Sequence, residues 1–236
     1  MKKLLSLILA AVLLTVATLS FTACGDTALT EYDLAVPSGS CYYTNNRDIE
    51  GRDVKYVMIT VKDHGSMIVL LDATTAPITV SNFLKLVNRG FYDGLTFHRV
   101  MNDFMIQGGC PNGNGTGDAG EDIIGEFALN GKWNDIFHKY GVISMARNGG
   151  TGAAYNTASS QFFICNSDSA SVKALDMSYA AFGYVIAGLS VVDSVTYYTA
   201  GYATDGNGGI TDKANQAVIA RIIEISAEEA WSYVEK

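Results

Sequence analysis

Residues 96–109, TFHRVMNDFMIQGG, hold a histidine and an arginine among large apolar residues. His98 has no serine or cysteine beside it, and the other histidines lie far away along the chain. Nucleophilic catalysis needs a nucleophile next to a base, and a zinc site needs several ligands at characteristic spacings. The segment therefore indicates neither chemistry, and Arg99 is the polar group that needs an explanation.

Two further segments match functional motifs only in part. Residues 115–120, GTGDAG, fit the glycine pattern of a dinucleotide-binding loop, which must lead from a strand into a helix. Instead EDIIGEFALN follows, and it places Glu121 and Asp122 where a phosphate would need donors. Ser159 and Ser160 lack the G-x-S-x-G context of a serine hydrolase. We interpret both segments as loops.

The acidic residues near the end of the chain do not form a calcium loop. Asp205, Asn207 and Asp212 lie in a glycine-rich segment but depart from the ligand order of an EF-hand. Because the histidines are also dispersed, we expect no metal ion and no other cofactor.

The composition is that of a folded, acidic domain. Of 236 residues, 48% are hydrophobic and 17% are charged, and 24 glycines provide for many turns. The length favours one medium domain with extra segments. The formal net charge is −8 and there is no basic run, which argues against nucleic acid as a partner because that binding depends on neutralising phosphates.

The N-terminus is typical of an export signal. Two lysines precede an apolar run that is shorter than the roughly 20 residues needed to span a bilayer comfortably. Cys24 directly follows Thr-Ala, which resembles the lipobox of bacterial lipoproteins, although Phe21 replaces the usual leucine. We expect a signal peptide at 1–23, acylation of Cys24, and an extracytoplasmic protein that its lipid anchors to the bacterial cell membrane. A plain signal peptide or a membrane-spanning anchor are the alternatives.

Three cysteines remain beyond Cys24, namely Cys41, Cys110 and Cys165. An odd number argues against a disulfide framework, and the spacing fits no zinc motif. We expect Cys165 to be a buried small hydrophobe, while a Cys110–Cys165 bridge stays open.

The rest of the chain predicts a β-rich domain at 54–230, after a lipidated, flexible tether at 24–53 and before a short tail at 231–236. Short β-branched and aromatic runs separated by turns predict strands. They lie at 56–62, 67–73, 96–100, 104–109, 141–146, 161–166, 181–186 and 217–226. Together they favour a closed or nearly closed antiparallel barrel.

Two helices are predicted to plug this barrel. Val80, Phe83 and Val87 recur on one helical face, with Pro77 in the first turn and Gly90 just past the end. The segment 190–195, SVVDSV, predicts a second, shorter helix.

Several segments resemble the cyclophilin family of peptidyl-prolyl cis/trans isomerases. These are FYDGLTFHRVMNDFMIQGG, GTG, GVISMAR, SSQFFI and LD-x-x-YAAFG-x-V, in the order and spacing of that family. The resemblance covers about 54–226. It implies a mainly β fold, a closed eight-stranded antiparallel barrel capped by two α-helices, that acts on proline-containing polypeptides such as unfolded or exported proteins. We expect a monomer.

The resemblance also assigns roles to matching residues. It places the catalytic arginine at Arg99 and supporting glutamines at Gln107 and Gln161. It places peptide-backbone contacts at Ala146 and Arg147. The proline pocket falls on Phe104, Met105, Phe163 and Leu175, with Tyr179 in its wall.

The sequence departs from the family pattern at four places. Ala174 stands where the best-known members have tryptophan, which puts tight binding of cyclosporin in doubt. Tyr179 replaces a histidine, Asn102 replaces a proline, and the loop at 147–159 is longer. The longer loop alters which peptides are expected to fit.

These residue types suit the rotation of an X–Pro bond. Amide resonance sets a barrier of about 18–20 kcal/mol, and the reaction breaks no covalent bond. A catalyst needs a donor aimed at the prolyl nitrogen of the twisted amide and an apolar grip on the ring, but no nucleophile or metal. Arg99 can supply the donor, and we expect His98 to be a structural residue that faces the barrel interior.

Two other functions remain open on the same fold. One is a non-catalytic chaperone or docking module that binds proline-containing peptides. The other is a surface adhesin or scaffold, which would require an exposed apolar patch away from the cleft.

Overall fold

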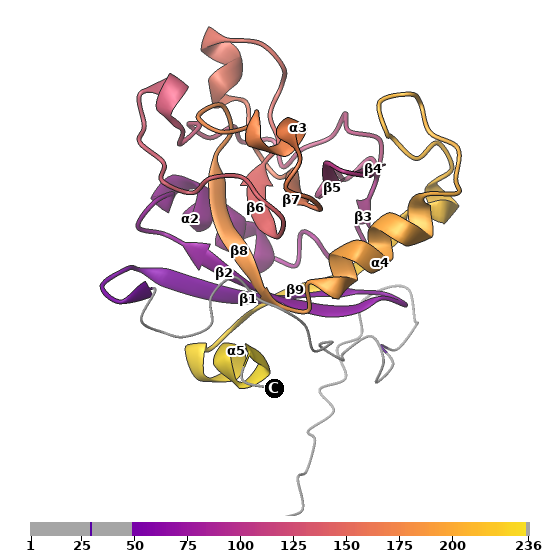
Figure 1. Cartoon of the computed structure of the whole chain (residues 1–236), viewed down its shortest axis with the longest axis horizontal. Coiled ribbons are helices and arrows are strands. Elements are labelled where there is room, and N and C mark those ends of the chain that lie inside the picture. The colour runs from indigo at the N-terminus through magenta and orange to yellow at the C-terminus, as the bar shows by residue number, and fades with distance from the viewer. Residues whose placement is uncertain (1–28, 30–48, 235–236) are drawn as a thin grey trace, which may run out of the picture.

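The computed structural model describes residue 29 and residues 49–234 (Figure 1). Cys24, Cys41, the predicted signal peptide and most of the predicted tether lie outside these residues. The described strands are β1 (Val54–Val61), β2 (Gly65–Asp72), β3 (Thr96–Phe97), β4 (Arg99–Met101), β5 (Met105–Gly108), β6 (Val142–Met145), β7 (Phe162–Cys165), β8 (Ala181–Ala187) and β9 (Ala217–Ile225).

The strands form one antiparallel sheet that nearly closes on itself. Its order is β3-β9-β1-β2-β8-β6-β7-β5-β4, so β3 and β4 lie at its two ends. A single residue, His98, separates these two strands in the chain, which brings the ends of the sheet together. If β3 and β4 are counted as one interrupted strand, the sheet has the eight positions that were expected. The prediction of a mainly β fold with a nearly closed antiparallel barrel is confirmed.

The two predicted helices are present as α2 (Pro77–Val87) and α4 (Ser190–Thr199). Proline at the start of α2 costs no hydrogen bond, because the first N–H groups of a helix have no partner within it. The helix ends before Arg89, so Lys85 is the basic residue of its last turn. Gly90 then turns the chain with a φ of 64°, which glycine adopts without a steric penalty.

Two shorter helices were not predicted. The helix α3 (Ala170–Lys173) begins at Ser169, whose hydroxyl accepts a hydrogen bond from the backbone N–H of Val172. The helix α5 (Ala227–Val234) runs across the expected boundary between residues 230 and 231. Among residues 49–234, no helix is long and apolar enough to cross a membrane.

The C-terminal segment is part of the folded domain rather than a loose tail. Trp231 is buried, and its indole N–H donates to the hydroxyl of Tyr56 in β1 at 3.1 Å. Figure 1 shows α5 beyond β1, at the opposite end of the view from α3. The helix α5 thus includes residues 231–234 of the expected tail.

Two hydrophobic clusters occupy the two faces of the sheet, because side chains alternate along a strand. The barrel interior holds a group of packed rings contributed by Phe83, Tyr92, Phe97, Phe162 and Phe182. The other face carries a second cluster that includes Met105, Phe163 and Leu175. The predicted pocket residues belong to this second cluster.

Candidate active site

Arg99 and Gln107 lie directly opposite each other on two paired strands, β4 at the end of the sheet and β5 next to it. The register of β4 and β5 places them as partners, so their side chains leave the same face of the sheet. Arg99 Nη1 donates to Gln107 Oε1 at 3.0 Å. The predicted catalytic pair is therefore in contact.

The guanidinium of Arg99 has further partners besides Gln107. Its Nε donates to the backbone carbonyl of Asn207 at 2.7 Å. Its Nη2 contacts the sulfur of Met101 at 3.0 Å, and its carbon lies 5.9 Å from the ring centre of Phe104. Burial lowers the pKa of Arg99 from its usual value, but an arginine stays charged at any working pH.

A loop that the sequence did not connect with the site supplies the Asn207 carbonyl. Asp205 Oδ1 accepts from the backbone N–H groups of Asn207 and Gly209, both at 2.9 Å, and so closes a tight turn. Hydrogen bonds from these two N–H groups lower the pKa of Asp205, with a smaller contribution from Arg99. Asp205 thus shapes the turn that presents the Asn207 carbonyl to Arg99.

Gly208 lets this turn approach β4 closely. Its φ is 86°, and a Cβ at this position would lie 2.4 Å from Cγ of Met101. Its carbonyl accepts from the N–H of Val100 at 2.9 Å. Glycine is needed here both for the backbone conformation and for the space.

The predicted apolar residues of the site gather in one cluster. Met105, Phe163 and Leu175 are buried, while Phe104 and Tyr179 are partly buried against them. The rings of Phe163 and Tyr179 meet edge to face, with their centres 5.9 Å apart. Tyr179 therefore forms part of the wall that the sequence predicted.

Gln161 extends the polar network from Gln107 to the glycine-rich loop. Gln107 Nε2 donates to Gln161 Oε1 at 3.0 Å. Gln161 Nε2 in turn donates to the carbonyls of Gly115 and Gly117, at 3.0 and 2.8 Å. The segment GTGDAG is thus a structural loop whose carbonyls anchor the site.

A hollow of about 500 Å³ lies beside this network. Four of the predicted site residues line it, namely Gln107, Ala146, Arg147 and Gln161. The lining also includes Asp118 and Asp122, so the rim of the hollow is largely polar. The backbone N–H of Ala146 is engaged with the carbonyl of Gln161 at 2.9 Å.

The guanidinium of Arg147 lies among three aromatic rings, an arrangement that sequence reasoning missed. It is 4.6 Å from the ring centre of Tyr179, 5.0 Å from that of Tyr155 and 5.4 Å from that of Phe127. It also donates to the carbonyls of Ser178, Asn148 and Gly150. Arg147 therefore ties the longer loop to the wall that contains Tyr179.

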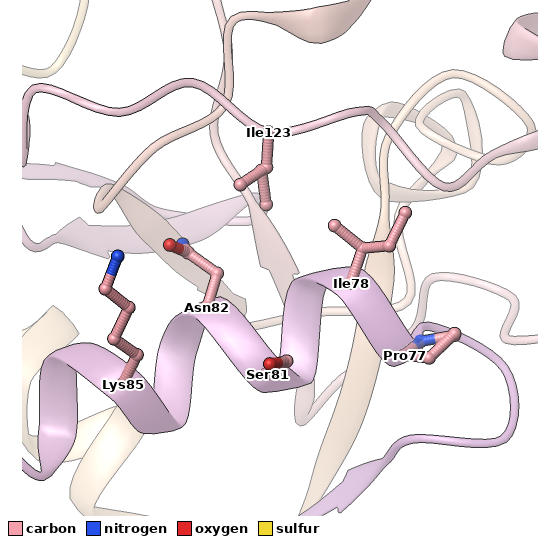
Figure 2. Close-up of a pocket in the computed structure, with 6 residues that line it drawn as sticks. All are labelled: Pro77, Ile78, Ser81, Asn82, Lys85 and Ile123. Carbon is pink, nitrogen blue, oxygen red and sulfur yellow. The ribbon is translucent and has the colours of Figure 1, made fainter.

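A second hollow lies along α2 and contains none of the predicted site residues. Figure 2 shows Ile123, on a loop that crosses the helix, pointing toward α2 while Ile78 points back toward the loop. Asn82 donates to the carbonyl of Ser159 at 2.7 Å. Because Ser159 also lines the first hollow, this bond holds α2 to that part of the site.

His98 lies buried beside Arg99, as its structural interpretation requires. Burial lowers its pKa to about 4, so the ring is neutral at physiological pH. Cys110 and Cys165 are both buried and free. No group of three or more His, Cys, Asp or Glu residues capable of holding a metal occurs in the described part of the chain.

The arrangement places a fixed cationic donor at the edge of an apolar cluster. Such a site can bind an apolar ring and donate a hydrogen bond to an atom beside it. Covalent catalysis finds no support in this geometry, because none of the predicted site residues is a nucleophile paired with a base.

Comparisons with known proteins agree with this geometry. Residues 56–221 match the family model described as cyclophilin type peptidyl-prolyl cis-trans isomerase/CLD. A Staphylococcus aureus (strain USA300) protein, named as a candidate peptidyl-prolyl cis-trans isomerase, is 46% identical over 124 residues, 50% of this chain and 56% of that protein. A peptidyl-prolyl cis-trans isomerase of Synechococcus elongatus is 54% identical over 91 residues, 39% of this chain and 55% of that protein. The match thus spans about half the length of these curated relatives.

Solved structures resemble the chain over a longer range. A cyclophilin type peptidyl-prolyl cis-trans isomerase of Cryptosporidium parvum has a TM-score of 0.61 at 27% identity, covering 74% of this chain and 99% of that one. A second structure of that protein, determined in the presence of the dipeptide Ala-Pro, has a TM-score of 0.60 at 27% identity, covering 73% and 99%. The present chain belongs to the family of cyclophilin-type peptidyl-prolyl cis-trans isomerases.

Proposed function

We propose that this protein is a peptidyl-prolyl cis/trans isomerase that stabilises the twisted X–Pro amide through Arg99. The observation that carries the proposal is how the guanidinium is held. Gln107 Oε1 accepts from Nη1, and the Asn207 carbonyl accepts from Nε. Among the described residues, Nη2 meets only the sulfur of Met101, which is a weak acceptor.

This geometry favours the transition state over the planar amide. Rotation out of the plane returns the lone pair to the prolyl nitrogen, which then becomes a better hydrogen-bond acceptor. Nη2 of Arg99 can donate to that nitrogen while Phe104, Met105 and Phe163 hold the proline ring. Because the donor is fixed before the substrate binds, little reorganisation is needed during rotation.

Two observations support proline-containing peptides as the substrate class, namely the surface around Arg99 and the structure of a related protein. The structure of the Cryptosporidium parvum protein was determined in the presence of Ala-Pro, a dipeptide that ends in proline. The site of the present chain offers an apolar cluster next to a polar hollow. We infer that it binds proline-containing segments of unfolded polypeptides, with the residues before the proline lying toward the hollow.

The experiment is an isomerisation assay on a proline peptide with wild-type protein, Arg99→Ala and Arg99→Lys. Removing a donor of this kind costs about 10²–10³-fold in rate, and we expect Arg99→Ala to lose kcat/KM on that scale. Arg99→Lys keeps the charge but loses the planar fork, so it should recover only part of the loss. Peptide binding should change by only a few-fold in both variants.

Two outcomes separate this function from a binding module. A wild-type protein that binds the peptide without accelerating its isomerisation would contradict the enzyme and support a docking role. Full activity in Arg99→Ala would contradict the mechanism while leaving the activity in place.

We further propose that the protein acts as a lipid-anchored monomer on exported proteins, outside the cytoplasmic membrane. The support is the N-terminal sequence, in which Cys24 follows an apolar run in the manner of a lipobox. Cys24→Ser should release the protein from the membrane fraction or leave it unprocessed. Unchanged membrane association with normal processing would contradict this localisation, and sedimentation of the soluble domain tests the monomer.

A further inference from the structure

A chain of hydrogen bonds lies directly behind the apolar cluster of the site. His138 Nε2 lies 3.0 Å from the hydroxyl of Ser144, and its Nδ1 lies 3.0 Å from Oδ1 of Asp176. The same carboxylate oxygen accepts from the backbone N–H of His138 at 2.6 Å. His138 is thus fixed at three points, through its ring and its main chain.

Ser144, His138 and Asp176 are hydrogen-bonded in the same order as the serine, histidine and aspartate of a hydrolytic triad. The burial of the serine excludes that use. Ser144 has no exposed surface, so its hydroxyl is not open to attack a substrate. The side chain of Asp176 is 25% exposed. A purely structural or positioning role is left for the three residues.

The partners of His138 belong to two different walls of the proposed proline pocket. Ser144 is the cross-strand partner of Phe163 in the β6–β7 pair. Asp176 directly follows Leu175, and Tyr179 comes three residues later in the same wall. His138 therefore bridges the strand that carries Phe163 and the segment that carries Leu175.

The imidazole also contacts the pocket through its face. The rings of His138 and Phe163 are stacked, with centres 6.1 Å apart and planes inclined by 17°. Phe163 in turn meets Tyr179 edge to face. The imidazole therefore packs on the ring proposed to contact the substrate proline.

The hydrogen bonds define one arrangement of protons. Burial lowers the pKa of His138, although Asp176 opposes the shift, and burial therefore favours the neutral ring. In the neutral ring one nitrogen donates and the other accepts. Nδ1–H donates to the carboxylate of Asp176, so Nε2 accepts from the hydroxyl of Ser144. All polar atoms of the ring are then satisfied without an ionic charge.

We propose that His138 is a positioning residue for the isomerase reaction, which sets the relative placement of Phe163 and the Leu175–Tyr179 wall by its bonds to Ser144 and Asp176. The proposal rests on the proposed isomerase function of the site. Misplacement of a contact group by about 1 Å can cost up to 10²-fold in rate, which sets the scale of the expected effect.

The test compares His138→Gln with His64→Gln as a matched control. His64 is also a buried histidine bonded to a serine hydroxyl, Ser194, but it lies outside the site. We expect His138→Gln to lower kcat/KM about tenfold or more, mainly through kcat, whereas His64→Gln keeps wild-type rates. Equal kcat and KM in both variants and wild type would overturn the proposal.

A second pair of variants separates positioning from stability. Asp176→Asn keeps an oxygen that accepts from both N–H groups of His138, and it should retain most of the activity. Asp176→Ala removes that oxygen and should behave like His138→Gln. Activity that follows the melting temperature of each variant, rather than the presence of this oxygen, would overturn the proposal.

A readout independent of turnover keeps the two proposals distinct. Aromatic NMR signals of Phe163 and Tyr179 should shift in His138→Gln and Asp176→Ala but stay in place in Asp176→Asn. If wild-type protein fails to catalyse isomerisation, the proposed function fails, and these signals together with peptide affinity still test the positioning. Unshifted signals in His138→Gln would overturn it.

Discussion

Arg99 and Gln107 form a cross-strand pair in which the amide oxygen of Gln107 lies 3.0 Å from Nη1 of the guanidinium. The same glutamine donates to Gln161, whose own amide group binds the glycine-rich loop. The direction of each bond is therefore fixed along the network, and the oxygen of Gln107 must face Arg99.

Because Gln107 accepts from Arg99 and donates to Gln161, two substitutions of Gln107 should have different effects. Gln107→Ala removes the acceptor from Arg99 and should lower kcat/KM by about 10- to 150-fold, since a hydrogen bond to a charged group contributes about 1.5–3 kcal/mol. Gln107→Glu keeps the oxygen toward Arg99 but cannot donate to Gln161, so it should retain the larger part of the activity. An isomerisation assay on both variants, with Gln161→Ala as reference, measures the difference. Equal losses in Gln107→Ala and Gln107→Glu would contradict the role of the acceptor.

The turn at Asp205 predicts a second contribution to the position of Arg99. Asp205→Ala removes the acceptor of the Asn207 and Gly209 N–H groups and should loosen the carbonyl that binds Nε. We expect kcat/KM to fall about threefold to tenfold, a part of the roughly 1.5–3 kcal/mol that a hydrogen bond to a charged group contributes, because the loosened carbonyl can still bind Nε. Asp205→Asn keeps the oxygen and should retain activity. Loss of activity in Asp205→Asn as well would point to the charge of Asp205 rather than to the turn.

The contact between Arg99 and Asn207 also marks a limit of sequence reasoning. Their hydrogen bond joins residues 108 positions apart, and it uses a backbone carbonyl that carries no side-chain signal. The pairing of Arg99 with Gln107 could be predicted from the sequence, because both lie in one contiguous segment with strands on either side of a turn. The family resemblance assigned both residues, whereas it carried no information on an interaction through the main chain of the loop that contains Asn207.

The fold was predictable where the pattern is local. The strands and α2 follow from short-range periodicity and from Pro77, so their approximate positions were correct. The helix α5 was missed because its burial depends on a distant partner, Tyr56, which receives the indole N–H of Trp231. Arg147 was expected to touch the peptide backbone, but its three aromatic neighbours come from separate loops that only the folded chain brings together.

The aromatic surroundings of Arg147 predict a stabilising role for its planar group. Arg147→Ala should lower the free energy of unfolding by about 1–3 kcal/mol, as expected for the loss of cation–π contacts and carbonyl hydrogen bonds. Arg147→Lys should recover only part of this, since an ammonium lacks the planar group whose Nε and Nη1 reach the carbonyls of Ser178, Asn148 and Gly150 from separate positions. Denaturant unfolding measures both variants. An Arg147→Lys protein as stable as wild type would show that charge alone is sufficient.

Because α5 packs against β1, we expect residues beyond 230 to be needed for the full stability of the domain. Trp231→Ala should destabilise the domain by about 3–5 kcal/mol, the range for removing a large buried aromatic side chain. Tyr197, in α4, is 87% exposed and provides the control, because Tyr197→Ala should leave the unfolding midpoint nearly unchanged. If both substitutions have equally small effects, α5 is not part of the stable domain.

The buried His98 predicts that acid weakens the fold below neutral pH. Its pKa is about 4 in the folded chain and about 6.5 in an unfolded one. The unfolded state therefore binds more protons between these values, and the stability that is fully present above about pH 6.5 decreases as the pH falls toward 4. A shift of this size corresponds to as much as about 3 kcal/mol. His138, whose pKa is also lowered, contributes in the same direction.

Unfolding by denaturant at a series of pH values isolates the contribution of His98. The difference in unfolding free energy between wild type and His98→Gln should change between pH 6.5 and 4 and stay constant above pH 7, because only the wild type carries this titrating group. Isomerase activity at neutral pH should survive in His98→Gln, since the proposed chemistry assigns the histidine no proton. A difference that is flat across the whole range would show that His98 titrates alike in both states, and a loss of activity at pH 7 would give His98 a part in the reaction.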